Sequence, residues 1–300
     1  MNAAYHIPVM LNEAIDMLNI QPGGVYVDCT FGGGGHSTAI LQKLNNEGRL
    51  FVFDQDADAF KNFKADARIV FIPENFRHLA RFLKLHGVAQ VNGVLADLGV
   101  SSYQFNEASR GFSIRFDGPL DMRMDSRNEL TAEKVIATYS EQQLHQLFEK
   151  YGEVTNSKTL AKHIVQVRQH THVSTIAQFK SAIANMVKGN PNKYFAQVFQ
   201  ALRIAVNDEL GALTDLLKQL PDLLMPCGRA VIITFHSLED RLVKNSFKGI
   251  VDEEENSPFG NSSFQPKFKL ITKKPLVPSA AEMKLNARSR SAKLRVAEKI

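Results

Sequence analysis

Three acidic side chains stand directly after short apolar runs in the first hundred residues, and a glycine loop follows the first of them. Asp28 ends one such run and is followed by the loop Gly32–Gly35, while Asp54 and Asp97 end two later runs. Glycine lets a backbone turn tightly and approach a ligand with no Cβ between them. A loop of this kind between a strand and a helix is typical of a site for a nucleotide-type cofactor.

The glycine loop does not fit a site for phosphates. A P-loop requires Gly-Lys-Ser/Thr, whose lysine meets the phosphates, but here Gly35 is followed by His36 and Ser37. A dinucleotide site needs the spacing G-x-G-x-x-G and places pyrophosphate at a helix N-terminus, where Asp28 would repel it.

S-adenosylmethionine suits the same residues, because it carries a cationic sulfonium and ammonium group and no phosphate. Asp28 would attract those cations, and Asp54, twenty residues after Gly34, is placed to accept both ribose hydroxyls. Asp97 is a third acid at the edge where open α/β sheets bind ligands. For each acid taken alone, helix capping or solvation is as good an explanation as cofactor binding. Three acids at three strand ends favour a methyltransferase.

Apolar runs alternate with helical patterns up to residue 96, which predicts a parallel sheet covered by helices on both faces. Strands are expected at 25–29, 50–53, 69–72 and 91–96, and helices at 8–18, 37–45, 56–65 and 75–86. Purely helical patterns then follow at 132–139, 141–150, 157–169, 176–187 and 194 to about 220. A strand at 230–235 and an antiparallel edge hairpin of 267–272 with 293–297 complete the pattern.

The helical stretch interrupts an α/β pattern. We expect a discontinuous methyltransferase domain of residues 1–105 and 193–300, and an inserted all-helical substrate-recognition domain of residues 106–192. Between the sheet and the insert, the charged segment 110–127 is long for a connection. We expect it to hold the target strand, with a structural brace between the two domains as the alternative. The segment 252–263 is expected to form a mobile loop.

Composition narrows the class of protein. No apolar run approaches the ~20 residues that span a membrane, and the N-terminus lacks a signal-peptide pattern. With only Cys29 and Cys227 there is no disulfide framework and no cysteine zinc site, so we expect a cytoplasmic protein. Residues 241–300 hold 13 Lys/Arg against 6 Asp/Glu. That cluster suits a nucleic-acid backbone, although a solvated basic face explains it equally well.

Eight blocks of sequence between residues 6 and 297 are specific enough to identify a family. They are His6-Ile-Pro-Val-Met-Leu11, Asp28-Cys-Thr-Phe-Gly-Gly-Gly-Gly-His36, Asp97-Leu-Gly-Val-Ser-Ser102, Arg110-Gly-Phe-Ser113, Asp117-Gly-Pro-Leu-Asp-Met-Arg-Met-Asp125, Ala201-Leu-Arg-Ile-Ala-Val-Asn-Asp-Glu-Leu210, Phe235-His-Ser-Leu-Glu-Asp-Arg241 and Ser289-Arg-Ser-Ala-Lys-Leu-Arg-Val-Ala297. These blocks closely resemble the MraW/RsmH family, bacterial methyltransferases that act on the N4 amine of a cytidine in 16S ribosomal RNA.

The resemblance implies a class I S-adenosylmethionine-dependent methyltransferase fold, Rossmann-like and mostly parallel, with an inserted helical domain. The substrate would be a cytidine in the decoding region of 16S rRNA, within the small ribosomal subunit, and a homodimer stays open. The residues that would form the cofactor pocket are Gly34, Gly35, His36, Asp54 at the ribose, Phe76 at the adenine, Asp97 and Gln104.

Two positions depart from the family's usual pattern. Pro226-Cys227-Gly228 stands where Pro-Gly-Gly is usual, and Gly33 stands where the family often has a larger residue. We expect neither departure to touch the chemistry.

The N4 amine of cytosine is a poor nucleophile, because its lone pair is delocalised into the ring. In-line positioning can lower such a barrier by ~7–11 kcal/mol, so acceptors for the amine hydrogens suffice and no strong base is needed. The candidate catalytic residues for this role are Asp97, Ser101, Ser102, His236 and Ser237.

Other chemistries stay as alternatives. Methylation at C5 would need a cysteine nucleophile beside the cofactor, and neither Cys29 nor Cys227 is placed for it. His170 and His172 lack partners in the sequence for a metal site, so we expect no metal. A non-catalytic RNA-binding factor and a nicotinamide oxidoreductase are the two other classes left open.

Overall fold

A computed structural model describes residues 8–250 and 267–300. The chain divides into two compact units, one of residues 1–99 with 211–300 and the other of residues 100–210. The sequence pattern placed the boundaries at 105 and 192, which would assign the helix Pro191–Asn207 (α9) to the methyltransferase domain. In the structure Val198 and Leu202 of α9 are buried in the hydrophobic cluster of the second unit. His6 and the expected loop 252–263 lie outside the described residues.

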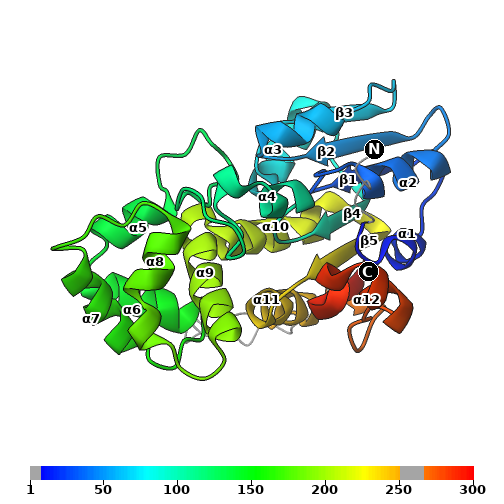
Figure 1. Ribbon diagram of the computed structural model, residues 1–300. Helices are drawn as coiled ribbons and strands as arrows, with labels where there is room; N and C mark the ends of the chain where they lie inside the picture. Colours follow the sequence, from blue (N-terminus) through cyan, green and yellow to red (C-terminus); the bar gives the residue numbers. More distant parts are fainter. Residues whose placement is uncertain (1–7, 251–266) are drawn as a thin grey trace, which may run out of the picture. The chain divides into compact units, whose positions relative to one another are not determined.

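Seven strands of the first unit form one sheet in the order β3-β2-β1-β4-β5-β7-β6, of which β1 to β5 are labelled in Figure 1. Their bounds are β1 Val25–Asp28, β2 Arg49–Phe53, β3 Ile69–Ile72, β4 Val91–Asp97, β5 Leu224–Thr234, β6 Phe268–Leu270 and β7 Lys293–Lys299. The first five strands pair in parallel, and β7 runs antiparallel between β5 and β6. The predicted mostly parallel sheet and its antiparallel hairpin are confirmed.

Helices cover both faces of this sheet. Alternate side chains point to opposite faces, so that Tyr26 packs in one hydrophobic cluster and Val27 in another. The first cluster lies under α1 and α2, and the second lies under α3, α10 and α11. The bounds in this unit are α1 Leu11–Leu18, α2 Gly35–Lys43, η1 Ala57–Asn62, η2 Phe76–His78, α3 Leu79–Leu85, α10 Glu209–Leu223, α11 Ser237–Lys248, α12 Ala280–Leu285 and η6 Ala287–Ser291. Burial on both faces explains why the strands are continuously apolar.

The second unit is helical, as the pattern predicted. Its bounds are α4 Ser102–Asn106, η3 Ala108–Arg110, α5 Ala132–Thr138, α6 Glu141–Lys150, α7 Ser157–Val167, α8 Ile176–Ala182, η4 Ala184–Met186 and α9 Pro191–Asn207. Ser140 and Thr175 begin α6 and α8 with capping boxes, each closed by a glutamine three residues later. None of the helices in the described parts of the chain is long and apolar enough to cross a membrane.

One predicted helix is in fact two. The pattern favoured a continuous helix from 194 to about 220, but Asp208 adopts a left-handed conformation with φ 47° and ends α9. A residue with positive φ cannot continue a right-handed helix, and α10 starts at Glu209. The amphipathic pattern runs through this break because both helices bury one apolar face.

Strand β5 starts earlier than the predicted residue 230. Leu224 already pairs with Val91, whereas Arg229 pairs with Gly93, so the chain bulges between these two points. Cys227 lies in the bulge, exposed, with φ 65°. This is the position where the resembling family usually has glycine.

We predict that Cys227→Gly stabilises the protein by about 0.5–1 kcal/mol. Relief of the left-handed strain, of order 1–2 kcal/mol for a residue with a Cβ, outweighs the greater entropy that glycine loses on folding. Cys227→Ala is the matched control, because it removes the thiol and keeps the Cβ. Urea denaturation should therefore show a raised midpoint for the glycine variant only; equal midpoints for both variants would refute the strain at Cys227.

Candidate active site

Asp28 ends β1 with a fully buried carboxylate. Its Oδ1 accepts the backbone N–H of Thr30 at 3.0 Å, and its Oδ2 accepts the hydroxyl of Ser37 at 2.6 Å. Burial raises the pKa of Asp28, although nearby His36 and these two hydrogen bonds act in the opposite direction. Ser37 lies in the first turn of α2, so this carboxylate ties the start of α2 to the end of β1.

Asp97 ends β4, next to β1 in the sheet, and its backbone N–H donates to the hydroxyl of Thr30 at 2.7 Å. Its side chain is 22% exposed, yet Oδ1 is covered and has no hydrogen-bond partner among the described residues. Burial raises the pKa of Asp97 well above its usual range, and the charges of Asp28, Glu239 and Glu282 raise it further. A covered carboxylate oxygen without a donor fits a ligand that brings a cation or an N–H group.

Asp54 follows β2 at the same edge of the sheet. Its Oδ2 accepts the backbone N–H of Gly32 at 2.7 Å, and its Oδ1 accepts that of Asp56 at 2.9 Å. Burial nevertheless raises the pKa of Asp54 to about 7. Each carboxylate oxygen has two lone pairs, so both oxygens keep capacity for a further donor. The glycine loop and Asp54 are therefore held together directly.

The glycine loop turns into α2 through two left-handed residues, Gly32 with φ 51° and Gly34 with φ 75°. At Gly35 a Cβ would lie 2.1 Å from Cγ of Pro8, whereas at Gly33 it would meet no atom within 4 Å. Glycine is therefore required at positions 32 and 34 by the backbone conformation, and at position 35 by the lack of space for a Cβ. Gly33, the position where the family often has a larger residue, is free of both demands.

His36 connects this loop to the segment before α1. Its Nε2 lies 3.2 Å from the carbonyl of Val9, and because a carbonyl only accepts, Nε2 carries the proton. Nδ1 then faces Oδ2 of Asp97 at 3.8 Å. Burial lowers the pKa of His36, against the pull of Asp28. His36 therefore gives the acids at this edge less positive charge than an exposed histidine would.

The segment before α1 is itself fixed from the other end of the chain. Met10 adopts φ 51°, and its backbone N–H donates to Oε1 of Glu282 in α12 at 2.7 Å. Glu282 therefore holds the residue next to Val9, whose carbonyl orients His36. No local pattern in the sequence predicts this contact, because the two residues are 272 positions apart.

His236 caps α11 just after β5. Its Nδ1 accepts the backbone N–H of Glu239, and its Nε2 lies 3.1 Å from Oε1 of the same residue. The buried Glu239 also accepts the N–H of Phe235 through Oε2. Nδ1 of His236 is thus used by its own helix, whereas the buried Nε2 makes no hydrogen bond among the described residues. Ser237, the next residue, is exposed.

The remaining predicted residues fall in two places. Phe76 is half-buried at the start of η2, against the core of the first unit. Ser101, Ser102 and Gln104 belong to the second unit. Ser101 is the N-cap of α4 and forms a capping box with the buried Gln104, whose Oε1 accepts the N–H of Ser101 at 2.9 Å. This is a structural use of Ser101 and Gln104 that the sequence expectation did not include.

The charged segment 110–127 is bonded to itself. Arg123 donates two hydrogen bonds to the carboxylate of Asp121, both at 2.8 Å, and also contacts the carbonyls of Ser126 and Asn128. Met122 and Met124 are buried, and the side chain of Asn207 bonds to the backbone of both. These bonds fix the segment within the second unit, while its expected role in holding the target strand stays a prediction.

The surroundings of Cys29, Cys227 and His172 bear on two alternatives, C5 methylation and a metal site. Burial raises the pKa of Cys29 well above its usual value, so its thiol is a weak nucleophile. Cys227 lies near the amino end of β5, away from the edge that carries Asp97. His172 lies 3.2 Å from Glu133, and both are at the surface.

The site also uses residues that sequence reasoning missed. Thr30 and Ser37 lie within two residues of the glycine loop, so the loop pattern could have pointed to them. Glu239 could have been found as the acid three residues after the N-cap, as in a capping box. Glu282 had no such signal.

A mostly parallel sheet with a glycine loop after β1 and carboxylates at the ends of β1, β2 and β4 defines a binding site of the methyltransferase class. The MraW methylase family matches residues 3–300, and the chain belongs to that family. The class I methyltransferase fold is thereby confirmed. A protein of Phocaeicola vulgatus named ribosomal RNA small subunit methyltransferase H is 50% identical, over 98% of this chain and 97% of its own. Its namesake in Flavobacterium johnsoniae is 48% identical, over 99% and 98% of the two chains.

We predict that Gly35→Ala destabilises the protein while Gly33→Ala does not. The new methyl group at position 35 would overlap the rigid ring of Pro8, and such overpacking costs typically ~1–3 kcal/mol. Chemical denaturation of both variants measures the difference. Equal stability of the two variants would show that Pro8 does not pack on the loop.

Proposed function

We propose that this protein transfers the methyl group of S-adenosylmethionine to the N4 amine of a cytidine in the decoding region of 16S rRNA, within the small ribosomal subunit. The observation that carries the proposal is the set of carboxylates Asp28, Asp54 and Asp97 around the glycine loop, the first fully buried and the other two partly buried. A phosphate-bearing cofactor would be repelled there, whereas a cationic one is attracted. The names of the relatives at about 50% identity support rRNA of the small subunit as the substrate.

The chain's residues fit S-adenosylmethionine part by part. Asp54, with spare lone pairs beside the backbone of Gly32, would accept the ribose hydroxyls. Gly34 and Gly35 would let the backbone approach the cofactor, with His36 beside them. Asp28 and Asp97 would face the cationic groups. The resemblance assigns Phe76 to the adenine and adds Gln104 to the residues that would bind the cofactor.

S-adenosylmethionine supplies an electrophilic methyl group on its sulfonium. The protein's task is then to orient the amine and to accept hydrogen bonds from it. Oδ1 of Asp97, covered and without a donor among the described residues, is the acceptor we assign. His236 is a positioning residue, since its Nδ1 already accepts the N–H of Glu239 and its Nε2 then carries a proton and cannot accept from the amine. Ser101, Ser102 and Ser237 would supply further contacts to the base, and the environments of Cys29 and Cys227 favour N4 over C5 methylation.

The proposed role of Asp54 makes nucleoside binding depend on pH. The ribose hydroxyls bind the ionised carboxylate best, and the pKa of Asp54 is about 7. The fraction of the protein with an ionised Asp54 therefore rises as the pH increases through 7. We predict that adenosine, neutral from pH 6 to 8, binds about tenfold more weakly at pH 6 than at pH 8.

Isothermal titration calorimetry at the two pH values measures this, and Asp54→Asn should bind adenosine weakly with little pH dependence. A pH-independent affinity in the wild type would contradict the ribose role. The same slope in Asp54→Asn would assign the dependence to another group.

The reaction itself is tested by nucleoside mass spectrometry of 16S rRNA treated with the protein and methyl-labelled S-adenosylmethionine. Label should co-elute with an N4-methylcytidine standard. Asp97→Ala should reduce turnover by about 10²-fold or more, the order expected when a reacting group loses its in-line positioning. Asp16→Ala, which removes an exposed acid of α1, is the control and should keep full activity. Label in 5-methylcytidine, or none in cytidine, would refute the proposal.

A further inference from the structure

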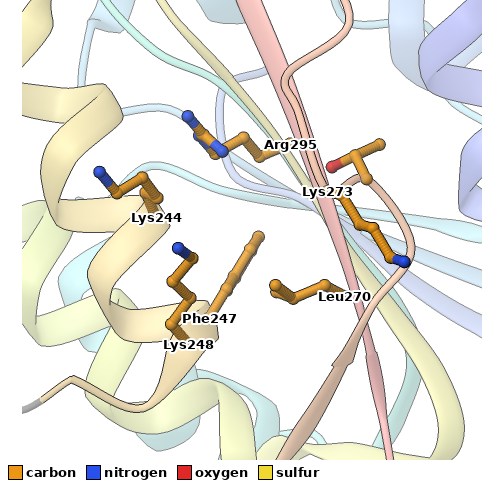
Figure 2. Close-up of a pocket in the computed structure, with 7 residues that line it drawn as sticks. Lys244, Phe247, Lys248, Leu270, Lys273 and Arg295 are labelled. Atoms are coloured by element: carbon orange, nitrogen blue, oxygen red, sulfur yellow. The ribbon is translucent and has the colours of Figure 1, made fainter.

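A small pocket of the first unit lies between α11 and the strands β6 and β7 (Figure 2). Its apolar part is formed by Phe247 and Leu270. Four cationic side chains line it as well, namely Lys244 and Lys248 from α11, Lys273 just after β6, and Arg295 from β7. We call this the α11–β7 pocket.

Arg295 is held in one orientation. Its Nε donates to Oδ1 of Asp240 at 2.6 Å and its Nη2 to Oδ2 at 3.3 Å, with only 9% of the side chain exposed. Asp240 also pairs with Lys293 at 3.2 Å. Burial alone would raise the pKa of Asp240, but these cations outweigh it and lower the pKa. The guanidinium therefore needs little further ordering to bind a ligand.

The positive charges in the pocket are not balanced by its own lining. No carboxylate is among the described residues that line it. Lys244 and Lys248 are one helical turn apart on α11, where two like charges repel each other. Lys273 adds to the same field, whereas the charge of Arg295 is offset by Asp240, so the three lysines supply the positive charge that prepares the pocket for an anion.

The chemistry of the lining selects the kind of anion. Lysine and arginine side chains only donate hydrogen bonds, and the hydroxyl of Thr272 already accepts the backbone N–H of Val296 at 2.9 Å. Donors alone can read the edge of a guanine but not the N–H groups of adenine or cytosine, whereas every backbone phosphate offers a charged acceptor. Donors alone, around an apolar patch that a sugar could cover, match a backbone phosphate.

We propose that the α11–β7 pocket binds a backbone phosphodiester of the substrate RNA, apart from the residues of the glycine loop. The inference rests on the proposed function, because it takes the substrate to be RNA. The pocket would anchor the strand without reading its sequence, as phosphate contacts do. It would also give the excess of basic residues at the C-terminal end a defined binding role.

The test is RNA affinity as a function of salt for Lys244→Gln/Lys248→Gln. Each phosphate of a single strand that the protein neutralises contributes about 0.7 to the slope of log affinity against log salt. The double variant should bind a 16S rRNA fragment more weakly, with a slope reduced by about 0.7 for each phosphate that it no longer neutralises. At saturating RNA its kcat should be unchanged and only its KM for RNA raised. The lost contact is one that the RNA makes equally in the ground state and in the transition state.

Lys43→Gln/Lys84→Gln is the matched control, since it removes two exposed lysines from α2 and α3 and has the same net charge. Its slope should stay that of the wild type, and Lys244→Arg/Lys248→Arg should restore binding. Equally weakened binding in the test and control variants, or wild-type binding in both, would overturn the pocket while leaving methylation intact. A wild type that binds no 16S rRNA would overturn the proposed function and the pocket with it.

Stabilisation of each variant by S-adenosylmethionine, followed by thermal unfolding, should match that of the wild type. Loss of that stabilisation in the double variant would show that the lysines act on the fold or the cofactor site, and would also overturn the pocket.

Discussion

The burial of carboxylates at the carboxyl edge of the sheet is the constraint on which the site depends. A charged carboxylate that leaves water loses solvation, and the loss is tolerable only where hydrogen bonds or an opposite charge replace it. Asp28 obtains them from Thr30 and Ser37, and Asp54 obtains them from Gly32 and Asp56. Asp97 keeps one covered oxygen without a partner among the described residues. The edge is therefore an incomplete electrostatic arrangement that a cationic ligand completes.

The backbone around these groups is organised so that they cannot move apart. The hydroxyl of Thr30 accepts the N–H of Asp97, which links the ends of β1 and β4. Beyond the sheet, Glu282 fixes Met10, and the neighbouring Val9 carbonyl orients His36. Residues from both ends of the first unit thus converge on one edge. Preorganisation of this kind is what positioning catalysis requires, because little reorganisation is left for the moment of reaction.

Much of this edge could be predicted from the sequence, and the reasons are physical. Parallel strands bring their carboxyl ends to one edge, so Asp28, Asp54 and Asp97 could be placed together from short apolar runs alone. The break at Asp208 could not be predicted, because the amphipathic pattern continues through it. The self-bonding of Arg123 with Asp121 and the contact of Glu282 with Met10 also depend on tertiary structure that no local pattern encodes.

The same limit applies to the roles of single residues. His236 appeared suited to accept a hydrogen bond from a base, yet its ring caps α11. Sequence spacing places a side chain near a site, but its remaining lone pairs depend on neighbours such as Glu239. Asp97 shows the opposite case, since its importance became clearer once its covered oxygen was seen to lack a donor among the described residues.

The central claim, that buried carboxylates await a cation, is tested most directly by counting protons released on cofactor binding. Calorimetric titrations in buffers of different ionisation enthalpy give that number. The raised pKa values of Asp28, Asp54 and Asp97 predict that cationic S-adenosylmethionine releases more protons at pH 7 than neutral-sulfur S-adenosylhomocysteine. Equal proton release for the two ligands would contradict the account.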